Sequence, residues 1–75
     1  MSAPRLDPTT LRWIADGRER EAKRLHRIAV KWHNLGDLVS VDFGQRKIGE
    51  LNEAADACVN LARSLRRRAT REERR

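Results

Sequence analysis

The sequence contains two long stripes of apolar residues, and their spacing constrains the fold more than any other feature. In each stripe the residues recur at alternating intervals of three and four positions. Because an α-helix has about 3.6 residues per turn, this spacing places them on one helix face. The first stripe is Leu11, Ala15, Ala22, Leu25, Ala29 and Trp32, with the charged Arg18 as the one exception in its series, and the second is Ile48, Leu51, Ala55, Cys58, Ala62, Leu65 and Ala69. We therefore expect an all-α fold of two amphipathic helices.

Residues with strong preferences for helix ends set the limits of both helices. Asp7 suits the N-cap, and Pro8 suits the first helical position, where proline is tolerated. Gly36 can adopt the left-handed conformation that closes a helix, and Asp37 can cap the next one. The expected organisation is a flexible N-terminal arm (1–6), a helical hairpin (7–70) made of helix 7–35, turn 36–37 and helix 38–70, and a basic C-terminal tail (71–75).

The start of the second helix is ambiguous, because residues 38–44 alternate between apolar and polar and include β-branched types. That pattern also suits a short β-strand. A single strand would need a pairing partner from another chain. A helix continues the apolar stripe back through Gly44 to Val41 and needs nothing further. We therefore favour the helix and keep a strand or loop as the alternative.

A tight turn between two long helices makes them run antiparallel. With the turn at residues 36–37, the two stripes meet in layers that mostly set a large side chain against a small one, as close packing requires. The layers are Trp32 with Val41, Ala29 with Gly44, Leu25 with Ile48, Ala22 with Leu51, Arg18 with Ala55, Ala15 with Cys58 and Leu11 with Ala62. We expect the aliphatic stem of Arg18 to cover the seam while its guanidinium reaches water.

The turn Leu35-Gly36-Asp37-Leu38 resembles the turn within tetratricopeptide motifs. Such repeats need about three copies for stability, whereas this chain has room for one hairpin. The resemblance covers four residues, and we infer no peptide-binding function from it.

A chain of 75 residues cannot bury a large core. A domain of this size buries about 60–65% of its unfolded surface and usually needs a disulfide, a metal or a partner chain. Cys58 is the only cysteine, so we expect no intrachain disulfide and a reducing, cytoplasmic setting. No apolar run approaches the ~18 residues that span a membrane, and the first residues lack the apolar core of a signal peptide. We expect no membrane association.

The two flanks of the predicted seam differ in character. One flank carries polar residues such as Glu19, His26 and Gln45, whereas the other widens the apolar stripe. Contiguous apolar surface usually marks an interface, and two hairpins that cover it would form a two-fold, antiparallel four-helix bundle. The expected homodimer interface is Ile14, Glu21, Ile28, Leu35, Lys47, Ala54 and Leu61, with Glu21 and Lys47 able to pair across it. A loosely packed monomer is the alternative.

The sequence contains no recognisable catalytic, cofactor-binding or metal-binding motif. Cys58 lies within the second stripe, where we expect a small buried residue rather than a nucleophile. His26 and His33 share the polar flank without a nearby thiolate or carboxylate, so hydrogen bonds to Gln45 and Asn52 are favoured over metal binding. A solvated helix face explains the acidic residues Asp42, Glu50, Glu53 and Asp56. The run from Gly44 to Gly49 lacks the spacing and the Lys-Ser/Thr ending of a phosphate-binding loop. We expect no enzymatic activity, no cofactor, no metal and no small-molecule substrate.

Positive charge is concentrated towards the C-terminus. The chain holds 17 Lys and Arg against 11 Asp and Glu, for a net charge of +6, and residues 59–75 contribute seven arginines against two glutamates. In an antiparallel hairpin this segment lies beside Arg5 and Arg12, with Trp13 pointing away from the seam. An outward Trp can stack on a base or anchor a protein partner; the Ala3-Pro4 arm or a dimer mate could also cover it. The expected partner-binding residues are Trp13, Arg12, Arg63, Arg66, Arg67 and Arg68.

Three hypotheses explain this basic end. The first is a non-catalytic interaction or regulatory module that binds another macromolecule, an unidentified protein, through the basic, Trp-containing end of the hairpin. The alternative is a non-specific nucleic-acid-binding protein that uses the C-terminal arginines, with an affinity that falls with salt. The third is a solvated helix end whose arginines interact favourably with the helix dipole. In style the Arg-rich chain resembles accessory proteins of GC-rich bacteria or their phages.

Overall fold

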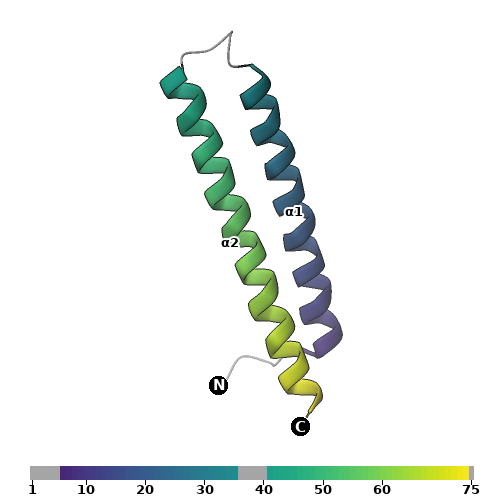
Figure 1. Ribbon diagram of the computed structural model, residues 1–75. Coiled ribbons are helices and arrows are strands. Elements are labelled where there is room, and N and C mark those ends of the chain that lie inside the picture. The colour runs from purple at the N-terminus through teal and green to yellow at the C-terminus, as the bar shows by residue number, and fades with distance from the viewer. Residues whose placement is uncertain (1–5, 36–40, 75) are drawn as a thin grey trace.

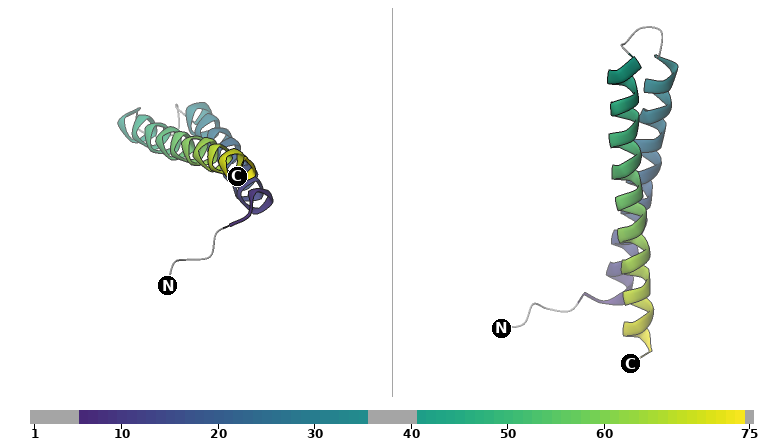
Figure 2. Two further views of the ribbon diagram at one scale, coloured as in Figure 1. Left: turned by 90° about the horizontal axis from the view of Figure 1, so that it is seen from below. Right: turned by 60° about the vertical axis from the view of Figure 1, so that its left-hand side comes forward.

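The computed structural model describes residues 6–35 and 41–74, and these residues form two α-helices. Helix α1 comprises Pro8–Asn34 and helix α2 comprises Val41–Glu73. The helices run antiparallel and lie side by side in both views (Figure 1, Figure 2). They form a rod of 55 × 22 × 14 Å. The predicted all-α helical hairpin is confirmed. Below, the open end of the hairpin is where α1 begins and α2 ends, and the closed end is the opposite one.

Asp7 caps the start of α1 as the sequence predicts. Its backbone is extended, and its carboxylate accepts a hydrogen bond from the Thr10 N–H at 2.7 Å. Pro8 follows within the first helical turn. The hydrogen bonds from Thr10 lower the pKa of the Asp7 carboxyl below its ordinary value, because they favour the charged form.

The helix limits differ from the prediction mainly at the end of α2. The predicted turn at 36–37, residues 38–40 and the arm up to residue 5 lie outside the described residues. Residues 41–44, for which the sequence also allows a strand, are helical. α2 continues to Glu73, so residues 71–73 belong to the helix and not to a tail. The buried Ala69 and an ion pair between Arg12 and Glu73 hold this last turn against α1.

Ion pairs between the helices show that the predicted register is wrong. That register puts Arg12 level with Leu61, which would separate Arg12 from Glu73 by about 18 Å along the helix axis. The structure joins their side chains in an ion pair.

The core is made almost entirely of small residues. Leu11 is the only large side chain that is fully buried among the described residues. The buried positions are Leu11, Ala15, Ala22 and Ala29 on α1 and Gly44, Ala55, Ala62 and Ala69 on α2. All of them lie on the predicted stripes, including the extension back to Gly44. Alanine and glycine let the two helix backbones approach closely, while Arg18 stays exposed, as expected for a side chain whose head reaches water.

The closed end is fastened by an aromatic pair. The rings of Trp32 and Phe43 meet edge to face with centroids 5.5 Å apart. The Lys47 ammonium lies 5.6 Å from the centroid of Phe43, within range of a cation–π interaction. The two ends of the hairpin are thus held by different chemistry, aromatic at the closed end and ionic at the open end.

Candidate macromolecule-binding surfaces

Two of the predicted partner-binding arginines form ion pairs within the hairpin. Arg66 of α2 donates hydrogen bonds to Asp16, at 2.8 Å, and to Glu19 on α1. Arg12 of α1 donates to Glu73 on α2. The pKa values of the Glu19 and Glu73 carboxyls are lowered by these hydrogen bonds, while those of Arg66 and Arg12 are raised. Arg12 and Arg66 therefore join the two helices at the open end, and their charges are largely offset there.

A separate set of arginines faces solvent on the outer side of α2. At about 100° per residue, Arg63, Arg67 and Arg71 fall within a sector of about 80° that points away from the buried alanines. Arg74 follows directly after the end of the helix. All four are exposed, and none forms an ion pair with a residue that the structure describes. We call this set the α2 arginine face.

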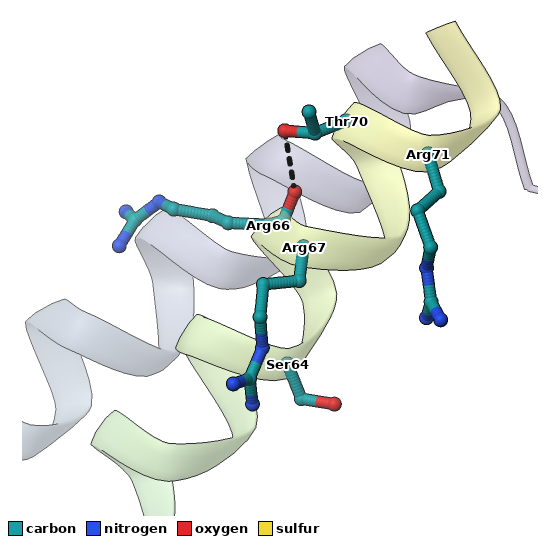
Figure 3. Close-up of a pocket in the computed structure, with 5 residues that line it drawn as sticks. All are labelled: Ser64, Arg66, Arg67, Thr70 and Arg71. Atoms are coloured by element: carbon teal, nitrogen blue, oxygen red, sulfur yellow. Dashed lines mark hydrogen bonds between the residues drawn. The ribbon is translucent and has the colours of Figure 1, made fainter. Parts of the chain in front are cut away.

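A hollow of about 680 Å³ lies along this part of α2. Its described lining residues are Ser64, Arg66, Arg67, Thr70 and Arg71. Figure 3 shows Arg67 and Arg71 extending along one side of the helix, towards Ser64, while Arg66 points the other way. The Thr70 hydroxyl donates to the Arg66 carbonyl at 3.1 Å. The arrangement offers the guanidinium groups of Arg67 and Arg71 and the hydroxyl of Ser64 to an anionic ligand, and the described lining contains no carboxylate.

Trp13 and the α2 arginine face lie on opposite sides of the hairpin. Trp13 is 70% exposed and sits midway between the buried Leu11 and Ala15, so it points directly away from α2. Arg67 is likewise two residues from Ala69, and it points away from α1. The predicted binding residues are all at the open end, but they do not form one surface. The helical spacing in the sequence predicts this separation, because Trp13 lies opposite the buried residues of α1 and Arg67 lies opposite the buried alanines of α2.

The outer face of α1 carries functional candidates that the sequence analysis missed. Starting from Trp13, the 3–4 spacing continues through Gly17, Arg20, Arg24, Arg27 and Lys31. Their cationic side chains are exposed. We call Arg20, Arg24, Arg27 and Lys31 the α1 basic row. The spacing of this row is as regular as that of the apolar stripe on the other side of the same helix, so the sequence alone contains the signal.

The predicted dimer-interface residues follow one flank of the hairpin. Ile14, Glu21, Ile28 and Lys47 are half-buried, whereas Leu35, Ala54 and Leu61 are exposed. Glu21 and Lys47 each have a neighbour on their own helix: Glu21 lies 3.8 Å from Arg24, and Lys47 lies 3.5 Å from Glu50. Their predicted pairing across an interface would compete with these exposed contacts.

The histidines line a second, smaller hollow on the polar flank. It measures about 240 Å³ and is lined by His26, Ala29, Val30, His33, Ile48 and Asn52. Within residues 6–35 and 41–74, no group of three His, Cys, Asp or Glu side chains is placed to hold a metal ion. Cys58 is a half-buried free thiol on the seam.

Neither described helix combines the length and the apolar character needed to cross a membrane. Comparison of the chain with models of protein families, with curated proteins and with solved structures finds no match.

Proposed function

We propose that this chain is a non-catalytic interaction module that binds an anionic macromolecule through the basic open end of the hairpin. The observation that carries the proposal is the α2 arginine face: Arg63, Arg67 and Arg71 project from one side of α2, and Arg74 follows the end of the helix. None of these four arginines forms an ion pair with a described residue. Arg12 and Arg66 support this face indirectly, because their ion pairs hold the end of α2 against α1. Trp13 belongs to the other side of the open end.

The arrangement favours binding over catalysis. Cys58 is half-buried on the seam and has no basic residue in its immediate sequence neighbourhood to activate it. Glu19 and Glu73 are engaged by arginines, which lower the pKa values of both carboxyls and make them poor proton donors at neutral pH. A single cysteine also suits a reducing compartment, and we place the protein in the cytoplasm on that ground.

The second candidate function, non-specific nucleic-acid binding, is favoured by the spacing of the arginines. Arg63, Arg67 and Arg71 follow one another at intervals of four residues, or about 6 Å of helix rise. A regularly spaced row of cations suits a ligand whose negative charges also repeat regularly, as phosphates do. An acidic protein surface would meet the same guanidinium groups with a less regular pattern of carboxylates.

The test measures the binding of polyglutamate, which represents an acidic protein surface, and of a random-sequence DNA duplex across a salt series. The variant R63Q/R67Q/R71Q is compared with R18Q/K23Q/R46Q, which removes the same charge from exposed positions outside the α2 arginine face. We expect the first variant to weaken binding by about tenfold or more at ~50 mM salt and the second by much less. The proposal is wrong if the wild-type chain binds neither probe, or if both variants lose affinity equally.

We further propose that the chain forms a homodimer, a four-helix bundle closed through the apolar flank. Leu35 and Leu61, which are 39% and 44% exposed, lie on this flank together with the half-buried Ile14 and Ile28. The core of one hairpin consists mainly of alanine, so it buries little apolar area. A second copy would cover the flank and leave Trp13 and Arg67, which point outwards, accessible.

A further inference from the structure

We propose that the outer face of α1 is a second binding surface, distinct from the α2 arginine face, and that its ligand is the phosphate backbone of a nucleic-acid duplex. The surface consists of Trp13, Gly17 and the α1 basic row. This inference goes beyond the proposed function, because it concerns the other side of the hairpin and can hold or fail independently of it.

The six positions form a straight stripe. At about 100° per residue they fall within a sector of about 80°, and from Trp13 to Lys31 they extend about 27 Å along the helix. The stripe lies opposite the buried residues Leu11, Ala15, Ala22 and Ala29, so packing against α2 leaves it uncovered. Trp13 at its start is the most exposed tryptophan of the chain, since Trp32 is half-buried beside Phe43.

Ion pairing within the hairpin leaves this stripe positively charged. α1 contains three acidic residues, and each is engaged: Asp16 and Glu19 with Arg66, and Glu21 with Arg24. The Glu21–Arg24 contact is long, at 3.8 Å, and the Arg24 side chain is mostly exposed. Arg20, Arg27 and Lys31 form no ion pair with any residue in the described part of the chain. The arginine supplied by α2 thus neutralises carboxylates that would otherwise offset the row.

Gly17 supplies an independent observation. A glycine inside a helix weakens it relative to alanine, and the packing of this hairpin does not call for one at position 17. A Cβ built there would meet only the end of the Arg20 side chain, at an ordinary contact distance of 3.8 Å. The glycine leaves bare backbone one turn after Trp13, where a ligand that contacts the indole could approach the helix closely.

A duplex fits these features better than an acidic protein does. B-DNA carries about one negative charge per 1.7 Å of its axis, so it can offer phosphates to every cation of a stripe about 27 Å long. A helix with its side chains is about 10–12 Å across, and the major groove is about 12 Å wide. α2 contacts the opposite side of α1 and would not obstruct entry of the stripe. Trp13 can then pack against sugar or base at one end, and the cations contact phosphates along the rest.

The experiment compares three variants that each lose three positive charges. R20Q/R27Q/K31Q alters the α1 basic row, R63Q/R67Q/R71Q alters the α2 arginine face, and R18Q/K23Q/R46Q alters neither. Binding of a random-sequence duplex is measured against salt concentration. Each phosphate contact contributes about 0.9 to the slope of log affinity against log salt, so we expect the α1 variant to reduce the slope by about 3 and the control by less than about 1. Helical circular dichroism checks that each variant is folded.

A second readout uses the tryptophans of otherwise unaltered chains. In W32F, Trp13 is the only tryptophan and its emission should change when duplex is added; in W13F, Trp32 at the closed end should not respond. An unchanged Trp13 emission together with an unchanged slope in the α1 variant would overturn this inference. If only the α2 variant lost affinity, the proposed function would stand and the second binding surface on α1 would be rejected. A Trp13 response to polyglutamate and not to duplex would reject the nucleic acid in favour of an acidic protein.

Discussion

Nη2 of Arg66 on α2 lies 2.8 Å from Oδ1 of Asp16 on α1, and the guanidinium of Arg66 also donates to Glu19, one turn further along α1. One side chain therefore joins two carboxylates of the opposite helix. Exposed ion pairs contribute little individually, but a guanidinium shared between two acids is better ordered than a single pair. Because the core is mainly alanine, such contacts matter more here than in a larger domain.

We accordingly expect R66Q to lower the melting temperature, by an amount that shrinks as salt is added, because ions screen exposed charges. R67Q is the matched control, since Arg67 is the next residue and has no ion pair with a described residue. Thermal melts followed by circular dichroism at low and high salt measure both. Equal destabilisation by the two variants would show that the ion pairs of Arg66 do not stabilise the hairpin.

The ion pairs of Glu19 and Glu73 make the stability of the hairpin depend on pH in the acidic range. The pKa values of Glu19 and Glu73 are lowered in the folded chain, by hydrogen bonds from Arg66 and Arg12. A carboxyl with a lowered folded-state pKa stabilises the fold above its unfolded pKa, and this stabilisation is lost as pH falls through the folded value. The melting temperature should therefore fall as the pH drops below 4.5, the ordinary value for Glu. E19Q/E73Q should melt lower at neutral pH and show a flatter acid dependence; a parallel curve would contradict the assignment.

The alanine seam predicts a sharp contrast between buried and exposed positions on α2. Ala62 is fully buried, whereas Ala57 is exposed on the same helix. A62L should push the helices apart and destabilise the hairpin by about 1–3 kcal/mol, the usual effect of overpacking. A57L should change the free energy of unfolding by less than about 0.5 kcal/mol, as surface substitutions usually do. Urea titrations measure both variants, and a tolerated A62L would show that the seam is loosely packed.

Much of the architecture could be predicted because the stripes are long and regular. The buried residues from Leu11 to Ala69 all lie on them, and the cap at Asp7 depends only on local chemistry. The register could not be found in the same way. A slide of α2 by half a heptad exchanges one stripe residue for the next, so it keeps an apolar face against α1 and changes only which residues are level. The ion pair between Arg12 and Glu73 excludes the predicted register, because their side chains could not reach each other in it.

The candidate surfaces were harder to predict than the fold. Sequence proximity groups Arg66, Arg67 and Arg68 into one cluster, but successive residues on a helix point in directions about 100° apart. Arg66 turns towards α1 and its carboxylates, while Arg67 points to solvent (Figure 3). The partners of Arg66 lie on the other helix, so only the assembled hairpin shows which arginines retain their charge.

The proposed dimer predicts that charges on the apolar flank separate the two copies. I14E/L61E should sediment as a monomer at concentrations where the wild-type chain is a dimer, because burying unpaired carboxylates in an interface is costly. V30E is the control: Val30 is also an exposed apolar residue, but it lies away from the predicted flank. A wild-type chain that sediments as a monomer would rule out the dimer.

Gly17 allows stability and binding to be separated. A Cβ at Gly17 would meet only the Arg20 side chain at 3.8 Å, and one at Gly49 would meet nothing within 4 Å. Both G17A and G49A should therefore stabilise the hairpin by about 1 kcal/mol in urea titrations, because alanine favours the helix.

If the backbone at Gly17 admits a ligand beside Trp13, G17A should bind duplex more weakly although it is more stable. G49A should keep the wild-type affinity, because Gly49 lies on α2 outside both basic surfaces. Unchanged affinity in G17A would mean that the ligand does not approach the helix there, and the role of Gly17 in the α1 surface would be rejected.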